Sequence, residues 1–345
     1  MMTDGVVVID PVSDPRWDQL VRRGRADVFH TAAWLAVLSD VYGFQLRARV
    51  LLAGGEAQAG IVYAKVDDEL GRRVVSLPFS DFCDPLVNDV EQWRLLSEDL
   101  FDHPVRFRCL HRTEPLADPR LAQAGKAHWH RIAVDLPEEE LWARLDPGAR
   151  RAIRKADSQG VEVRVADHPD DLRRFFELHL RVRKNKYRLL AQPYRFFEAI
   201  WERFIAAGDG ALLLAEVGGS VVGGVMFLSF GDTLYYKFNA SDLDRLDIRP
   251  NDTIMWHGMR LARDKGLAFV DLGVSDWDQE GLIRYKEKYA TDHGVVTTLV
   301  GGPPPGSEVT RFRGMLPSLT TMLTEVDVPD FVTERAGDLY YRLFT

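Results

Sequence analysis

Short apolar segments bounded by turn residues predict a series of strands in the first half of the chain. Apolar residues at helical spacing predict a helix over residues 32–42, with Thr31 as its N-cap and Gly43 as its stop. A further helix is expected over residues 90–100. The strands are expected at residues 5–9, 46–53, 57–66, 72–78, 105–110 and 128–134.

The pattern changes near Pro147, where strands give way to basic helices. A strongly basic helix is expected over residues 150–156, and it ends at Gly160. Tight turns at Gly218-Gly219 and Gly231-Asp232 then join three strands. We expect helices at 169–186, 194–207, 251–265 and 308–343, and strands at 161–165, 211–217, 220–230, 233–239 and 293–300.

Residues 266–289 are the most informative stretch of the chain. The apolar segment 267–272, bounded by glycines, predicts a strand that is buried on both faces. Polar residues 275–279 then predict a loop. Because ligands bind outside the carboxyl ends of strands in open α/β sheets, we expect a site near this loop. Apolar spacing next predicts a short helix that carries three basic residues: Arg284, Lys286 and Lys288.

Composition places the chain among globular proteins. Its 345 residues suffice for two domains, and 46% hydrophobic with 28% charged residues is ordinary for that class. No apolar stretch has the length of a transmembrane helix, and the first residues do not read as a signal peptide. Cys83 and Cys109 stand outside any metal-ligand spacing. We therefore expect a cytoplasmic protein with reduced thiols, no metal and no cofactor.

Charge is unevenly distributed along the chain. A net charge of −8 argues against broad, non-specific binding of nucleic acid. Residues 144–188, however, hold 13 Lys and Arg against 7 Asp and Glu. Such a basic segment fits an anionic substrate, and it fits a solvated helix face equally well, so both interpretations stay open.

The element order of the second half resembles the GNAT acyltransferase fold: two helices, three antiparallel strands, a helix and a strand. Several segments in a shared order also resemble the Fem family of double-GNAT aminoacyltransferases. In the second half these segments are Ala149–Gly160, Leu234–Ser241, Arg249–Asn251, Phe269–Gly273 and Gly281–Tyr289. The first half resembles the FemAB-like branch of this family in three segments: Phe29–Trp34, Tyr42-Gly43 and Ser76–Asp81.

This resemblance covers roughly residues 25–300 and implies a mixed α/β fold with two GNAT-like domains. Each domain would hold a mostly antiparallel sheet flanked by helices, over residues 1–145 and 146–306. Residues 307–345 would form a helical segment that packs back on the first domain. The implied reaction transfers an aminoacyl group from the 3′ acceptor end of aminoacyl-tRNA to an amine. That amine would belong to a peptide, a peptidoglycan precursor or a natural-product acceptor.

The resemblance also assigns roles in the second domain. Tyr285-Lys286 is similar to a Phe-Lys pair of the family, which implies that Lys286 stabilises the oxyanion or the leaving ribose oxygen. Tyr285, Tyr236 and Lys288 would then bind substrate. The alternative for Lys286 is a surface lysine on an amphipathic turn. Three further residues match a family helix that binds phosphate, with a solvated helix end as the alternative: Arg183, Lys184 and Lys186.

In the first domain, Asp81 and Asp84 lie near a family acid that would accept a proton from the incoming ammonium. Either residue is also an ordinary turn-former. The family's basic residue near Val37-Leu38 is missing here, which puts a UDP-sugar-peptide acceptor in doubt. Residues 246–252 lack the glycine-rich loop that cradles the pyrophosphate of coenzyme A, and Pro250 removes one amide. Asn251 is expected to cap the following helix.

Three functions remain open on these grounds. The first is an aminoacyl-tRNA-dependent N-aminoacyltransferase. The second is an acyltransferase that uses acyl-CoA or a carrier-bound thioester on an amino sugar or another small amine. The third is a catalytically silent binding module on the same scaffold. The missing glycine loop favours the first over the second, and Lys286 argues against the third.

Overall fold

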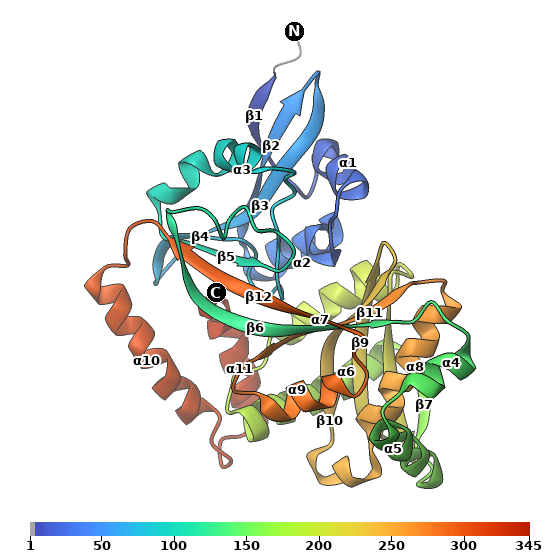
Figure 1. The fold of residues 1–345 in the computed structure, drawn as a ribbon. Coiled ribbons are helices and arrows are strands. Elements are labelled where there is room, and N and C mark those ends of the chain that lie inside the picture. Colours follow the sequence, from blue (N-terminus) through green and yellow to red (C-terminus); the bar gives the residue numbers. More distant parts are fainter. Residues whose placement is uncertain (1–3) are drawn as a thin grey trace. The chain divides into compact units, whose positions relative to one another are not determined.

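The computed structural model describes residues 4–345, which divide into two compact units. The first unit holds the chain up to Ala127 together with Gly294–Leu316 and Arg342–Thr345. The second unit holds His128–His293 and Pro317–Tyr341. Three elements begin in one unit and end in the other, namely β6 (Leu121–Ala133), β12 (Asp292–Gly301) and α10 (Ser307–Leu323) (Figure 1).

The first unit is built on an antiparallel meander of β1 to β4, with β5 parallel to β4 and antiparallel to β12. Thr31 caps α2 by accepting from the Trp34 amide at 3.3 Å, and Gly43 (φ 70°) ends that helix, as expected. The bounds are β1 (Gly5–Ile9), α1 (Pro15–Arg23), α2 (Ala32–Tyr42), β2 (Gln45–Ala53), β3 (Glu56–Asp68), β4 (Gly71–Val75), α3 (Val90–Ser97) and β5 (Val105–Cys109).

The second unit is built on the antiparallel strands β7, β8, β9 and β10, followed by β11 parallel to β10. Helices α6 and α7 each continue into a π-helical turn, over Val182–Tyr187 and Trp201–Ile205. The bounds are α4 (Glu138–Arg144), α5 (Pro147–Ser158), β7 (Glu162–Val165), α6 (Pro169–Arg181), α7 (Tyr194–Ile200), β8 (Gly210–Val217), β9 (Ser220–Phe230), β10 (Thr233–Ser241), α8 (Pro250–Asp264), β11 (Phe269–Asp276), α9 (Glu280–Glu287) and α11 (Asp330–Tyr340).

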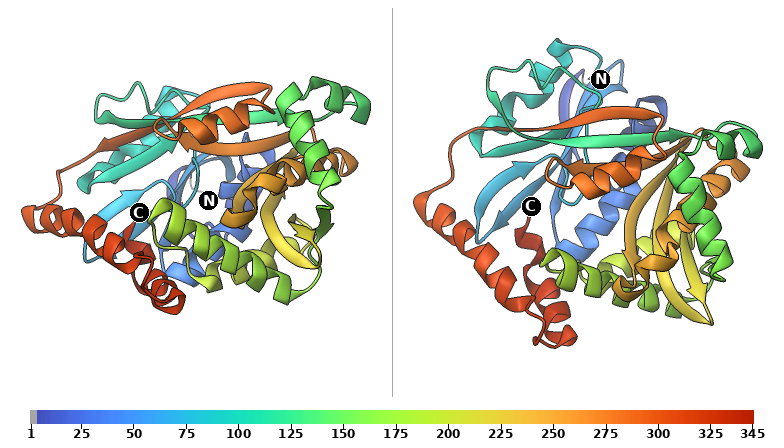
Figure 2. Two further views of the ribbon diagram at one scale, coloured as in Figure 1. Left: turned by 90° about the horizontal axis from the view of Figure 1, so that it is seen from below. Right: turned by 60° about the horizontal axis from the view of Figure 1, so that its bottom comes forward.

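Helices cover both faces of this second sheet, and two adjacent glycines of β9 show how closely they approach. A Cβ atom at Gly223 would lie 3.2 Å from Pro250 of α8, whereas one at Gly224 would lie 2.8 Å from Phe175 of α6. Successive residues of a strand point to opposite faces, so α6 and α8 lie on opposite sides of β9. Figure 2 shows the yellow strands of this unit with helices on either side.

The mixed α/β architecture confirms the expected fold class. The polar loop expected at residues 275–279 is shorter in the structure, because β11 continues to Asp276 and buries Ser275, and only residues 277–279 lie between β11 and α9. Helices α1 and α4 and the first half of β6 were not predicted. Helix α1 carries a readable signal nonetheless, since Asp14 accepts from the Arg16 amide at 3.0 Å ahead of an apolar stripe.

Two absences hold for the part of the chain that the structure describes. No helix within residues 4–345 is long and apolar enough to cross a membrane. In the same range no group of three His, Cys, Asp or Glu side chains is arranged to hold a metal ion. Cys83 and Cys109 are both buried and unbonded to each other.

Candidate active site

The candidate site of the second unit begins where β10 and β11 stop pairing. Their parallel ladder joins Thr233–Tyr235 to Phe269–Asp271 only, although both strands continue. Gly273 has a φ of 65°, a left-handed conformation that glycine adopts readily, and so it turns β11 at this point. The carboxyl ends of two parallel strands are a common place for a ligand in such sheets.

A buried carboxylate fixes the turn in β11. Asp271 accepts from the Gly273 amide at 2.6 Å and from the Trp129 indole of β6 at 2.8 Å. Bonds from two N–H donors satisfy a carboxylate that burial would otherwise destabilise. Asp271 therefore holds the end of β11 in position against β6.

Lys286 lies beside this end of β11, because α9 directs its side chain inward. The residue is only 4% exposed, so the interpretation as a surface lysine is wrong. Its ammonium donates to the carbonyl oxygen of Val274 at 2.8 Å. A buried ammonium is a strong local source of positive charge, because little water surrounds it to screen its field.

His130 lies within reach of the charge of Lys286, and two further histidines lie close to His130. The His130 ring is buried, and its centroid lies 5.2 Å from that of His293 and 6.0 Å from that of His128. His128 in turn packs against the exposed Trp277 at 3.9 Å. Burial, together with Lys286 and the other two histidines, lowers the pKa of His130 to about 4. The cluster therefore presents a neutral imidazole next to a cation at pH 7.

Two buried polar atoms of this region lack a hydrogen-bond partner within residues 4–345: Nδ1 of His130 and the hydroxyl of Ser275. Unpaired buried polar atoms are uncommon in proteins, because each costs free energy. They occur where a ligand or water completes the bonding. Neither residue was singled out from the sequence, although His128 and His130 alternate on one face of a predicted strand.

The aromatic residues next to Lys286 connect α9 to the start of α8. The Tyr285 hydroxyl donates to the carbonyl of Asn251 at 3.0 Å, and the Tyr289 hydroxyl donates to Asp252 Oδ1 at 2.7 Å. Burial raises the pKa of both hydroxyls and of Asp252. Lys286 follows Tyr285 directly in the sequence, so these bonds to α8 also hold the backbone of Lys286 in place.

Asn251 does not cap α8, contrary to expectation. The helix begins at Pro250, so Asn251 lies inside its first turn. Its Oδ1 instead accepts from Asn239 Nδ2 at 2.9 Å and from Ser241 Oγ at 2.5 Å, both on β10. Side chains of β10 and α9 thus form hydrogen bonds with the side chain and the backbone carbonyl of Asn251 at the start of α8.

Two further candidates of the second unit lie near these aromatic residues. The Tyr236 ring packs on Phe227 at 5.6 Å, and burial, Tyr187 and Asp252 raise the pKa of its hydroxyl. The ammonium of Lys288 lies 5.8 Å from the Tyr285 ring centroid, a cation–π distance. Tyr236, Tyr285, Lys286 and Lys288 therefore belong to one neighbourhood, and their substrate contacts stay a prediction.

The basic residues 183–186 lie on the π-helical turn after α6 and differ in surroundings. Arg183 donates to the carbonyl of Leu190 at 3.0 Å, and Lys186 is exposed. Lys184 is buried, and its ammonium is bonded to the Val328 carbonyl and lies 2.8 Å from Asp330 Oδ1. Lys184 therefore anchors the start of α11. The geometry gives no support for the predicted role of Lys184 in phosphate binding.

Asp81 and Asp84 lie in the loop of the first unit that follows β4. Asp84 is buried and accepts from the amides of Leu110, His111 and Arg112 at 2.9 to 3.2 Å. Burial raises the pKa of Asp84, and these amide bonds oppose that rise. Its contacts are those of a loop anchor. Asp81 is half-buried, and a catalytic role for either residue stays a prediction.

Comparisons with known proteins bear on the fold of the chain. Residues 146–287 match a family described as "Acetyltransferase (GNAT) domain". FemX is 16% identical, with a TM-score of 0.64 over 84% of this chain and 96% of its own. L-PGS from Bacillus licheniformis is 10% identical, with a TM-score of 0.57 over 92% and 99%.

A tandem GNAT protein from the clavulanic acid biosynthesis pathway is 11% identical, with a TM-score of 0.52 over 87% of this chain and 99% of its own. No curated protein matches the chain. At these identities the structures show the fold alone, and that fold is the one that the Fem resemblance implied. Residues 146–287 match the GNAT acetyltransferase domain, which supports an acyltransferase activity, and the chain has the double-GNAT fold seen in FemX and in the tandem GNAT protein.

Proposed function

We propose that this acyltransferase moves an aminoacyl group from aminoacyl-tRNA to the amine of a peptide, a peptidoglycan precursor or a natural-product intermediate. The observation that carries the proposal is the buried ammonium of Lys286, held at the end of β11 beside a neutral His130. Acyl transfer needs a positive charge where the carbonyl oxygen becomes negative. Charged tRNA is a cytoplasmic substrate, so we place the reaction there.

The chemistry assigns distinct roles to the two side chains. The acceptor nitrogen attacks the ester carbonyl, a C–N bond forms, and negative charge develops on the carbonyl oxygen. Lys286 stabilises that charge, and the burial of its ammonium strengthens the interaction. The C–O bond to the ribose then breaks, and the ribose oxygen leaves with a proton. The proton that the attacking amine releases passes to the ribose oxygen as it leaves. His130, whose pKa is lowered to about 4, stays neutral at pH 7 and is suited to orient the amine by a hydrogen bond rather than to take up its proton.

The start of α8 supports tRNA as the donor over coenzyme A. A conventional coenzyme A site cradles the pyrophosphate with amides of a glycine-rich loop at a helix N-terminus. Here α8 starts with Pro250, follows Arg249 in a left-handed conformation (φ 63°), and has Asn251 engaged by β10. A thioester of acyl-CoA or of a carrier protein is the second candidate, and the match of residues 146–287 to an acetyltransferase family favours it.

A transfer assay distinguishes the two donors. The purified chain is incubated with tRNA charged with a labelled amino acid mixture, or with labelled acetyl-CoA, and a pool of amine acceptors. We expect label in an amide product from charged tRNA only. In parallel, charged tRNA at ~100 times its dissociation constant should stabilise the fold by ~2.7 kcal/mol. Micromolar binding of acetyl-CoA with no effect of charged tRNA would overturn the proposal in favour of the thioester donor.

A further inference from the structure

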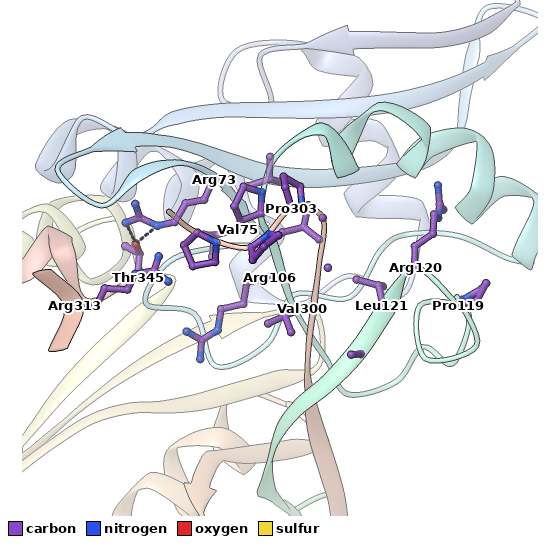
Figure 3. A pocket seen from close by; sticks show the side chains of 18 residues that line it. Arg73, Val75, Arg106, Pro119, Arg120, Leu121, Val300, Pro303, Arg313 and Thr345 are labelled. Atoms are coloured by element: carbon purple, nitrogen blue, oxygen red, sulfur yellow. Dashed lines mark hydrogen bonds between the residues drawn. The ribbon is translucent and has the colours of Figure 1, made fainter. Parts of the chain in front are cut away.

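A pocket of about 570 Å³ lies in the first unit, apart from the residues discussed so far. It is bounded by β4, β5, the end of β12 and the first turns of α10 (Figure 3). Its volume falls within the ~300–1,000 Å³ that are typical of small-molecule sites. Val75, Val300 and Pro303 form part of its wall, so the pocket offers apolar contact area as well as charge.

Four arginines line the pocket, and two of them are already neutralised. Arg73 is buried and forms two hydrogen bonds with Asp68, at 2.7 and 3.0 Å. Arg120 is paired with Asp118 at 2.7 Å. Both guanidinium groups therefore have a carboxylate as countercharge and serve chiefly to shape the wall.

The other two arginines have no such countercharge. Within residues 4–345, neither Arg106 nor Arg313 has a side-chain hydrogen bond or an ion pair, and both are exposed to the pocket. Burial and the charges of Arg73 and Arg106 lower the pKa of Arg313, which shows that these guanidinium groups lie close enough to repel one another. Asp68 neutralises Arg73, and no Asp or Glu side chain among the described residues that line the pocket counters Arg106 or Arg313.

We propose that this pocket binds a small molecule that carries a phosphate monoester on an apolar body. Two guanidinium groups match the charge and the planar oxygen edges of a phosphate dianion, to which arginine can donate in pairs. The valine and proline wall suits the body of the ligand. The three arginines Arg73, Arg106 and Arg313 stand far apart in the sequence, which is why no local motif revealed the site.

The test uses the full-length protein and phenyl phosphate as the probe, titrated by calorimetry at constant ionic strength because surface charge effects depend on salt. We expect saturable binding that is tighter than that of inorganic phosphate. Arg106→Met and Arg313→Met should each weaken it by about tenfold or more, since each removes charge-assisted hydrogen bonds. Arg311→Met is the matched control, because Arg311 lies on the same helix and does not line the pocket.

Three results would overturn the proposal. The first is the lack of saturable binding of phenyl phosphate to the unaltered protein. The second is an equal loss in the Arg311→Met variant, which would indicate attraction by a general positive surface. The third is equal affinity for inorganic phosphate, which would show that the apolar body of the ligand contributes nothing to binding. Thermal melts of each variant establish that the fold is retained, and this is expected because neither Arg106 nor Arg313 has a partner to lose within the described residues.

Discussion

The ammonium of Lys286 lies 2.8 Å from the carbonyl oxygen of Val274, and this bond ties α9 to the end of β11. This hydrogen bond satisfies the buried ammonium, and it explains how a lysine of this short helix can be buried while the neighbouring cations are not. Arg284 on the same helix is exposed and Lys288 just after it is half-buried, so the three cations of this segment differ in surroundings. That difference makes them a matched set for testing the proposed electrostatic role.

Replacing Lys286 with Met keeps most of the side-chain volume and removes the charge. If the ammonium stabilises the transition state, kcat and kcat/KM should fall together by about 10²–10³, with KM nearly constant. Steady-state kinetics with the donor identified by the transfer assay measure this. The loss of a donor to Val274 should also lower the free energy of unfolding by about 1–3 kcal/mol, so the assay is run well below the melting temperature.

Arg284→Met and Lys288→Met serve as controls for the same measurement. Each removes one positive charge from the same segment without removing the buried ammonium. We expect changes in kcat/KM of less than about tenfold, because the interactions of fully or partly exposed charges are screened by solvent and salt. Equal effects of all three substitutions would show that the segment acts only through its summed charge, and Lys286 would lose its assigned role.

His130 should make stability depend on pH. Its pKa is lowered from 6.5 to about 4, so the folded protein keeps the ring neutral while the unfolded chain takes up a proton below pH 6.5. The unfolded state thus binds more protons between pH 6.5 and 4, and the free energy of unfolding falls as pH falls, by up to about 1.4 kcal/mol per pH unit. Above pH 6.5 the ring is neutral in both states, and the free energy of unfolding no longer changes with the titration of His130.

Urea unfolding of the unaltered protein and of the His130→Gln variant, at several pH values, isolates this effect. His179, whose pKa burial and Arg183 lower to about 3, remains in both proteins and cancels in the difference. We expect the stability difference between the two proteins to shift in favour of the variant as pH falls from 6.5 to 4. A difference that is independent of pH in this window would mean that His130 is not held neutral by its surroundings.

Local patterns predicted the elements well where local chemistry determines them. Thr31 and Gly43 bound α2 as expected, because a cap and a left-handed stop act over a single turn. Apolar spacing placed Tyr285 and Tyr289 correctly in or next to α9 but could not show that Lys286 is buried, since that depends on the Val274 carbonyl twelve residues earlier. His130 lies on a third element, β6, so the pattern of residues 266–289 could not predict that it lies near Lys286.

Asp84 should behave as a structural anchor when it is replaced with Asn. Its Oδ1 accepts from three successive amides and its Oδ2 from two of them, and Asn would replace one of these oxygens with an NH₂ group that faces amide donors. The amide bonds become fewer and lose their charge assistance, so the free energy of unfolding should fall by about 1–3 kcal/mol. Chemical unfolding measures the loss. If Asp84 were the proton acceptor instead, the folded variant would lose activity with little change in stability.

The buried Lys184 tests whether the basic turn after α6 binds substrate or holds the C-terminal helix. Its ammonium is bonded to the Val328 carbonyl and paired with Asp330, which is itself half-exposed. Lys184→Met leaves the carbonyl without a donor, and α11 loses its attachment at the first turn. We expect a loss of about 1–3 kcal/mol and faster amide exchange over Asp330–Tyr340, with KM unchanged. Lys186→Met, an exposed neighbour on the same turn, should change stability by no more than about 0.5 kcal/mol. A rise in KM for Lys184→Met with unaltered exchange in α11 would show instead that the ammonium contacts the substrate.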